Sequence, residues 1–337
     1  MTQPWNAFLA QEGAELTDFA VRFADTPADI SGCNVVPLRH LAHIASRGED
    51  SAEFLHNLLS NDVRHMADDG IAWNSFNSPK GRMLASLLVH RDLDGHGLVL
   101  SADIAPAMLK RLSMYVLRSK VRLTMSDVVL LGLCGPGAVA TLAAAGLNVP
   151  AGAMRQTVAD GVRCLRIQGD NLVLVTDEAG APALWQRLRG AGAAPAGTDR
   201  WHLAMIRAGL PLVTAATQEE FVAQMLNFEL IGGVSFQKGC YPGQEIVART
   251  QYLGKLKKRM YRVHVPDGHV PSPGEDVYTP EFGEQSAGKL VNVAPAPGGG
   301  FEALAVMQIG CAQAGEARLG GPRGVRLGFL ELPYPLE

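Results

Sequence analysis

Apolar residues recur with a helical period in the segment that follows Asp50 and Ser51, either of which can cap a helix. Between Phe54 and Leu59 the apolar positions come at i, i+1, i+4 and i+5, so they would form one face of a helix. The pattern predicts a helix that ends near Asn61.

Short apolar runs bounded by turn residues predict strands in the rest of the chain. Segments 71–76 and 83–89 are joined by Asn77–Gly81, whose proline and glycine supply turn geometry, and they predict a hairpin. From Met260 onward short strands alternate with Pro/Gly turns, which indicates a small all-β domain. Residues 1–34 show no sustained period and are expected to form a partly ordered arm. Further strands are expected at 98–100, 121–125, 128–133, 162–167 and 172–176, and further helices at 104–116, 138–145, 182–188 and 201–208.

The composition describes a folded protein of two or three domains, because the chain has 337 residues, of which 47% are hydrophobic and 19% charged. The net charge of −3, from 30 basic and 33 acidic residues, gives no global positive field for nucleic acid or an anionic membrane. No breaker-free apolar run reaches the length of a membrane span, and the first residues lack the basic and apolar regions of a secretory signal. The expected compartment is the cytoplasm.

The five cysteines are scattered, odd in number and form no C-x-x-C pair. This usage argues against a disulfide framework and against a zinc ribbon. His40 and His43 form an isolated H-x-x-H with no further paired ligands, so no metal site is expected. At least one cysteine is a candidate working thiol.

The segment Asn227–Gly254, NFELIGGVSFQKGCYPGQEIVARTQYLG, concentrates reactive and polar residues among glycines. Lys238 beside Cys240 would favour the thiolate, which is the form that attacks electrophiles or binds metal. Gln244 and Glu245 offer an amide and a carboxylate suited to the donor and acceptor edge of a heterocycle. The alternative is that Cys240 is a small buried residue with a packing role.

Residues 238–245, KGCYPGQE, resemble the K-G-C-[FY]-x-G-Q-E signature of the YgfZ family, folate-binding proteins related to the glycine-cleavage T-protein (aminomethyltransferase). The resemblance covers roughly Val35 to the C-terminal barrel. It also includes the segments 226–228, 232–236, 247–249, 61–63 and 78–81.

The resemblance implies an α+β fold: a three-domain aminomethyltransferase-like ring with ferredoxin-like α/β units and a C-terminal β-barrel, around a central hole that holds tetrahydrofolate or a related reduced folate. The implied division is an N-terminal arm (1–34), a first α+β domain with the signature loop (35–49 and 126–254), a second α+β domain (50–125) and the barrel (255–337).

The function implied by the resemblance is to support the assembly or repair of iron–sulfur enzymes, including a radical enzyme that thiomethylates tRNA. The implied partners are a folate and iron–sulfur client proteins, with no membrane partner. Cys240 and Lys238 are the candidate catalytic residues. The candidate folate-binding residues are Trp201, Asn227, Tyr241, Gln244, Glu245, Arg249 and Lys80. A second family tryptophan would fall near Leu41, where this chain has no aromatic residue.

Two enzyme classes compete with this interpretation. A folate-dependent aminomethyltransferase is disfavoured because alignment places Ala85–Ser86 where the transferase has paired aspartates. A dinucleotide-dependent oxidoreductase would use the G-x-G-x-x-A run at 135–140 with Asp160, but Asp160 falls in an expected turn, so the glycines are better explained as a strand-to-helix turn. The basic run 255–259 is either a solvated strand entrance or an anion site, and by itself it does not indicate direct RNA contact.

Overall fold

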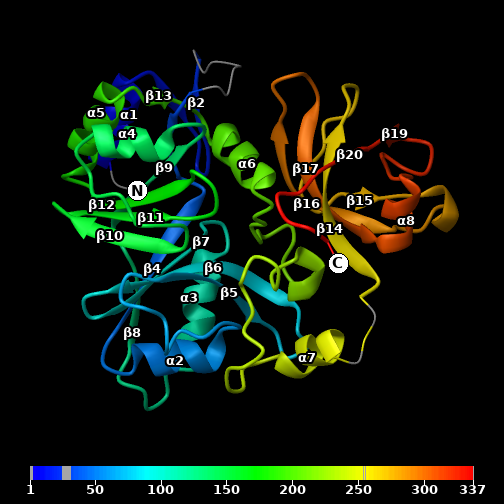
Figure 1. The fold of residues 1–337 in the computed structure, drawn as a ribbon, viewed down its shortest axis with the longest axis horizontal. Coiled ribbons are helices and arrows are strands. Elements are labelled where there is room, and N and C mark those ends of the chain that lie inside the picture. The colour runs from blue at the N-terminus through cyan, green and yellow to red at the C-terminus, as the bar shows by residue number, and fades with distance from the viewer. Residues whose placement is uncertain (1–2, 25–31, 253, 255, 337) are drawn as a thin grey trace. The chain divides into compact units, whose positions relative to one another are not determined.

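The computed structural model describes residues 3–24, 32–252, 254 and 256–336 (Figure 1). The chain divides into two compact units. Unit 1 comprises Met1–Leu55, Val63–Ala72 and Leu88–Ala204, and unit 2 comprises His56–Asp62, Trp73–Leu87 and Met205–Glu337. Each unit therefore combines segments that are far apart in the sequence.

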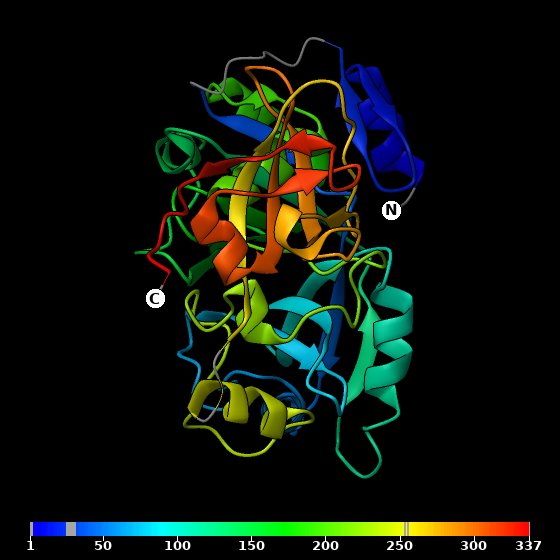
Figure 2. The same cartoon turned by 90° about the vertical axis from the view of Figure 1, so that its right-hand side faces the viewer.

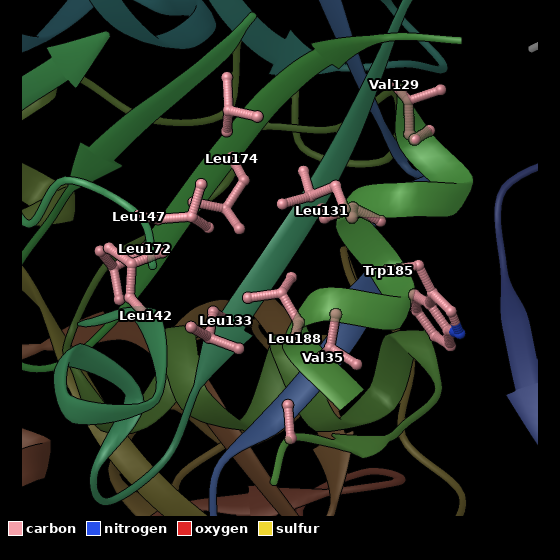
Figure 3. Packing of buried hydrophobic residues seen from close by; sticks show 14 of the residues in the cluster. Val35, Val129, Leu131, Leu133, Leu142, Leu147, Leu172, Leu174, Trp185 and Leu188 are labelled. Atoms are coloured by element: carbon pink, nitrogen blue, oxygen red, sulfur yellow. The ribbon is translucent and has the colours of Figure 1, made fainter. Parts of the chain in front are cut away.

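Unit 1 contains a six-stranded sheet with the order β10-β11-β12-β9-β3-β13, in which β13 pairs with β3 in parallel and the other pairs are antiparallel. Alternation along β9 directs Val129, Leu131 and Leu133 to one face, where α4 and α5 cover them (Figure 3). The predicted strands and helices between 128 and 190 are confirmed. The bounds are β3 Asn34–Pro37, β9 Val128–Cys134, α4 Ala138–Ala144, β10 Arg155–Ala159, β11 Val162–Arg166, β12 Leu172–Asp177, α5 Ala181–Gly190 and β13 Ala194–Pro195.

The N-terminal residues are part of the core of unit 1, so the prediction of a partly ordered arm is wrong for residues 3–24. This segment forms α1 (Gln3–Gln11), β1 (Ala14–Leu16) and β2 (Val21–Phe23). Trp5 and Leu9, one helical turn apart, are 1% and 0% exposed, and the ring of Trp5 meets Trp185 edge-on with 6.3 Å between centroids. Two buried residues on a nine-residue helix are too few for a sustained sequence period. The predicted arm residues 25–31 lie outside the described part of the chain.

A second sheet, of five strands, has the order β5-β6-β7-β4-β8. The predicted hairpin segments are its β5 and β6, and the helix predicted after Asp50 is α2. The helix predicted at 104–116 ends earlier, at Ser113, in α3. The bounds are β4 Leu41–Arg47, α2 Ser51–Leu58, β5 Ile71–Asn77, β6 Met83–Asp92, β7 Gly95–Ser101, α3 Ala105–Ser113 and β8 Arg122–Met125.

The C-terminal part of unit 2 is a five-stranded antiparallel sheet with the order β15-β16-β17-β14-β20 (Figure 2, yellow to red). Its core is made of small and branched apolar side chains such as Val263, Leu290 and Ala305. The all-β character predicted from Met260 onward is confirmed, and among the described strands β15 and β20 are open edges. The bounds are β14 Lys258–Val265, β15 Asp276–Val277, η2 Pro280–Phe282, β16 Gly288–Pro295, β17 Phe301–Gln308, α8 Ile309–Ala314, β18 Arg318–Leu319, β19 Val325–Arg326 and β20 Gly328–Leu330.

The glycine-rich run at 135–137 is a strand-to-helix turn, as predicted. Gly135 and Gly137 have φ angles of 95° and 77°, which favour glycine. Asp160 lies in the turn of an antiparallel hairpin formed by β10 and β11, not at the end of a parallel strand. This part of the sheet therefore lacks the topology of a dinucleotide-binding fold. In the described residues, no helix is both long and apolar enough to cross a membrane.

Candidate functional site

The signature residues 238–245 lie in unit 2, between the 3-10 helix η1 (Ala223–Leu226) and α7 (Gln244–Tyr252). The helix starts inside the signature, and the Gln244 Oε1 atom accepts a hydrogen bond from the Tyr241 N–H at 3.2 Å. This side chain therefore fixes the turn that enters the helix. Glu245 and Arg249 are exposed one helical turn apart on α7.

Two glycines allow the signature to pack directly on the turn after β5. A Cβ atom on Gly243 would lie 2.5 Å from the Ser78 carbonyl oxygen and 2.7 Å from the Cα of Gly81. A Cβ on Gly81 would lie 2.8 Å from the Cβ of Ile246. Both glycines also have positive φ angles, of 78° and 70°. Any side chain at either position would push the two segments apart, and Lys80 is exposed on the same turn.

Lys238 holds the signature to the end of α2. Its side chain is buried, with 8% exposure for the residue, and its Nζ donates hydrogen bonds to the backbone carbonyls of His56 and Leu59. Positive charge is favourable at a helix C-terminus, where the last carbonyls lack helical partners. The ammonium also lies 4.9 Å from the ring centroid of Tyr241. Lys238 therefore fixes the loop to the end of α2 and also contacts the ring of Tyr241, which follows Gly239 in the loop.

Cys240 is the exposed cysteine, whereas the four others are buried. Burial raises the pKa of the Cys134 thiol to about 12 and that of Cys164 to about 11, and it also raises the pKa of Cys33. These groups stay protonated at neutral pH. The packing alternative for Cys240 therefore conflicts with its position on the surface.

The residues before the signature are fixed to β5 through Ser60. Its Oγ donates to the Gly233 carbonyl at 2.6 Å and accepts from the Ser75 N–H at 2.7 Å, and its carbonyl accepts from the Ser235 N–H at 2.9 Å. All of these groups belong to unit 2. Two segments included in the resemblance also contact this region, because the Asn61 Nδ2 donates to the Gly232 carbonyl at 2.6 Å and Gly81 packs against Gly243.

Asn227 is fully buried with a left-handed backbone, φ 57°. Its Nδ2 donates to the Met260 carbonyl at 2.9 Å, and its Oδ1 accepts from Arg259 at 3.1 Å. Arg259 also pairs with Glu229 at 2.8 Å, so the end of the basic run is tied to this segment, while Lys255 lies outside the described residues. Both ends of the Asn227 amide are therefore used to join the segment to β14.

Tyr241 is 7% exposed, and burial raises the pKa of its hydroxyl to about 12. Trp201 is placed in unit 1, on α6 (Thr198–Arg207), and is 3% exposed. A Cβ on Gly132 of β9 would lie 2.4 Å from the Trp201 ring, so the indole packs tightly on that strand. The structure brings Lys238, Tyr241 and Gln244 together in unit 2.

Sequence reasoning passed over two aromatic groups beside this site. His56, 3% exposed, bonds Asp62 Oδ1 through its Nδ1 at 3.1 Å, and its Nε2 is 3.8 Å from the Cβ position of Gly239. Trp73 on β5 is half-buried. The sequence did offer a signal for Trp73. It lies in the first strand of the predicted hairpin, and alternation along a strand shows which side chains share a face.

The fold is that of a known class of protein. The glycine cleavage system aminomethyltransferase T from Bartonella henselae matches with a TM-score of 0.80, and the match covers 99% of this chain and 97% of that chain at 18% identity. The mixed α/β architecture is therefore the aminomethyltransferase T fold.

Relatives at the sequence level define the family within this fold. The tRNA-modifying protein YgfZ of Escherichia coli O157:H7 (strain EC4115 / EHEC) is 34% identical over 234 residues, which span 68% of this chain and 71% of the relative. The tRNA-modifying protein YgfZ of Shigella sonnei (strain Ss046) is 33% identical over the same shares. No protein-family model matches the chain. The chain belongs to the YgfZ family, which confirms the resemblance based on residues 238–245.

Proposed function

We propose that this protein binds tetrahydrofolate or a related reduced folate and supports the assembly or repair of iron–sulfur enzymes, including tRNA-modifying radical enzymes, in the cytoplasm. The name of the relatives, tRNA-modifying protein, supports the proposed role in tRNA modification. The aminomethyltransferase T fold supports the proposed binding of a folate. The observation that carries the proposal is Cys240, an exposed thiol on a loop whose neighbours Lys238 and Gly243 are held in place by buried contacts.

The proposed roles follow from the chemistry of each side chain. Cys240 is the working thiol, and Lys238 positions it. Glu245 supplies a carboxylate for the donor edge of the pteridine, and the cations of Arg249 and Lys80 suit the carboxylates of a folate tail. Trp201, Asn227, Tyr241 and Gln244 complete the proposed set. The three-domain ring, with boundaries near 35, 50, 126 and 255, is part of the same proposal.

Tetrahydrofolate is expected to bind with a stoichiometry of one, and Glu245→Gln is expected to weaken binding about tenfold, because it removes one charge-assisted hydrogen bond. Isothermal calorimetry under reducing conditions measures both. Glu284→Gln, an exposed glutamate near β16, is the matched control and should bind like the wild type. No heat with tetrahydrofolate or any other reduced folate would rule out the folate part of the proposal.

The second candidate function, aminomethyl transfer, is favoured by the fold alone. The positions aligned with the transferase aspartates hold no carboxylate: Ala85 is fully buried, and the Ser86 Oγ is committed to the Val213 N–H at 2.9 Å. We expect no folate-dependent transfer from an aminomethyl donor. Turnover above that of a heat-killed sample would contradict this expectation and would favour the transferase function.

A further inference from the structure

The two faces of β5 differ in how far their polar side chains are hydrogen-bonded, and one of them carries Trp73, Ser75 and Asn77. Side chains two residues apart along a strand point the same way, so these three form one strip, here called the β5 strip. On the opposite face, Asn74 Oδ1 accepts the Asn61 N–H at 2.9 Å and Phe76 is 1% exposed. β5 is an edge strand of its sheet (Figure 1). The whole strip belongs to unit 2.

The inner end of the β5 strip has hydrogen-bonding capacity that the protein does not use. Ser75 is 0% exposed and Asn77 is 2% exposed, yet the Ser75 hydroxyl and both polar atoms of the Asn77 amide have no hydrogen-bond partner. The hydroxyl of Ser78, the next residue, is also buried without a partner. Unpaired buried polar atoms of this kind are rare in folded proteins and destabilise them, so a missing partner is the ordinary explanation.

The outer end of the strip is aromatic and partly open. Of the four tryptophans, Trp5, Trp185 and Trp201 are at most 3% exposed, whereas Trp73 is half-buried. The Asn61 Nδ2 donates to the Trp73 carbonyl at 3.0 Å and to the Gly232 carbonyl at 2.6 Å, which places the tryptophan beside the segment that precedes the signature. Gly232 is exposed, and a Cβ there would meet nothing within 4 Å.

We infer that the β5 strip binds the flat heterocycle of the ligand: Trp73 stacks on its face, and Asn77 pairs with a donor and acceptor on its edge. An indole provides a stacking surface, and a primary amide offers one acceptor and two donors. The strip carries no charge, so it selects a neutral ring rather than a phosphate or carboxylate. This inference rests on the proposed folate function and assigns its pteridine end to these residues, with Trp73 as a stacking group.

The signature loop packs beside Asn77. Gly243 lies against Ser78, the neighbour of Asn77, with no room for a side chain between them. A ligand bound at the Asn77 amide would therefore lie next to the turn on which the signature loop packs. The inference in this way links ligand binding to the position of the working thiol.

The experiment is a titration with tetrahydrofolate, followed by calorimetry and by tryptophan fluorescence, in four single variants. Trp73→Ala is expected to weaken binding at least tenfold. Trp73→Phe is expected to retain binding within about threefold but to lose most of the fluorescence change that binding causes. Asn77→Ala is expected to weaken binding about tenfold while removing no hydrogen bond from the free protein, because the buried Asn77 amide has no partner there. Trp5→Phe, at a buried tryptophan of unit 1 outside the proposed set, is the matched control and should keep both the affinity and the fluorescence change.

The outcomes separate the inference from the function on which it rests. If the wild type binds and Trp73→Ala binds equally well, or if Trp73→Phe keeps the full fluorescence change, the β5 strip is not the heterocycle site. If the wild type itself shows no binding, the folate proposal fails and the inference is overturned with it. Trp73→Phe keeps the test decisive if Trp73→Ala fails to fold, because its fluorescence readout needs only a folded, binding protein.

Discussion

Cys240→Ala is expected to abolish rescue of iron–sulfur-dependent tRNA thiomethylation in cells that lack their own YgfZ-type protein, while the thermal midpoint stays within about 2 °C of the wild type. The reason is that the side chain is exposed and the loop is held by Lys238 and Gly243, so removing the sulfur removes chemistry without removing buried contacts. Tetrahydrofolate affinity should be largely unchanged. The measurements are thiomethylated tRNA by mass spectrometry, melting and calorimetry on one purified variant.

The same argument predicts how the thiols react. Iodoacetamide should alkylate Cys240 far faster than the four buried cysteines, since alkylation requires access to the sulfur and burial denies it. Cys164→Ala is a suitable contrast, because Cys164 is 2% exposed and its loss should lower the thermal midpoint while leaving rescue intact wherever the protein accumulates. Full rescue by a stable Cys240→Ala protein would falsify the proposed role of the thiol.

Unit 1 is expected to lose most of its stability between pH 6.5 and pH 4. Burial lowers the pKa of His43 to about 4, that of His90 to about 3 and that of His96 to about 4, and it also lowers the pKa values of His40 and His202. Because the native state holds these rings neutral and the unfolded state protonates them below about 6.5, their contribution is complete above that pH and is lost as the pH falls toward the folded values. At pH 5 the lowered pKa values of His43 and His90 each correspond to a loss on the order of 2 kcal/mol.

The geometry of the His43–His90 pair explains why protonation is unfavourable. The two Nε2 atoms are 3.0 Å apart, so one must donate and the other accept. His90 Nδ1 lies 3.0 Å from the Arg91 carbonyl, which can only accept, so His90 carries its proton there and His43 donates from Nε2. His43 Nδ1 then accepts from the Ser126 hydroxyl at 2.9 Å. A second proton at His90 Nε2 would remove the acceptor that the His43 Nε2–H uses in this arrangement.

Urea unfolding at pH 7 and pH 5, followed by the fluorescence of Trp185 and the other buried tryptophans, measures the acid sensitivity. His90→Gln should be less stable at pH 7 but should lose less stability on going to pH 5, since one titrating group is gone. His264→Gln, a half-exposed histidine on β14, serves as a control that should leave the pH dependence of unit 1 unchanged. Equal stability at the two pH values would show that these rings are not held neutral by the fold.

The spacing of apolar residues and the positions of turn residues in the sequence determined most of the secondary structure. The helix after Asp50, the hairpin around 77–81 and the strands near 128–133 and 172–176 follow from local patterns that the tertiary structure preserves. The α1 segment was missed because only Trp5 and Leu9 of its nine residues carry the signal. A short helix docked on a larger core needs few apolar positions, so its period is too weak to recognise.

The signature residues 238–245 were sufficient in the sequence to find the family and the candidate thiol, because a run of eight positions is specific. The sequence could not decide what Lys238 contacts: adjacency suggested that its charge serves Cys240, whereas in the structure its ammonium binds the carbonyls at the end of α2. That helix lies some 180 residues earlier in the chain, and only folding brings the two together. The sequence also could not decide which tryptophan is exposed. Trp73 lies in a predicted strand and Trp201 in a predicted helix, and neither pattern distinguishes a half-buried tryptophan from a buried one. Burial is a property of what packs over a side chain, and for both tryptophans that was decided by distant segments of the chain.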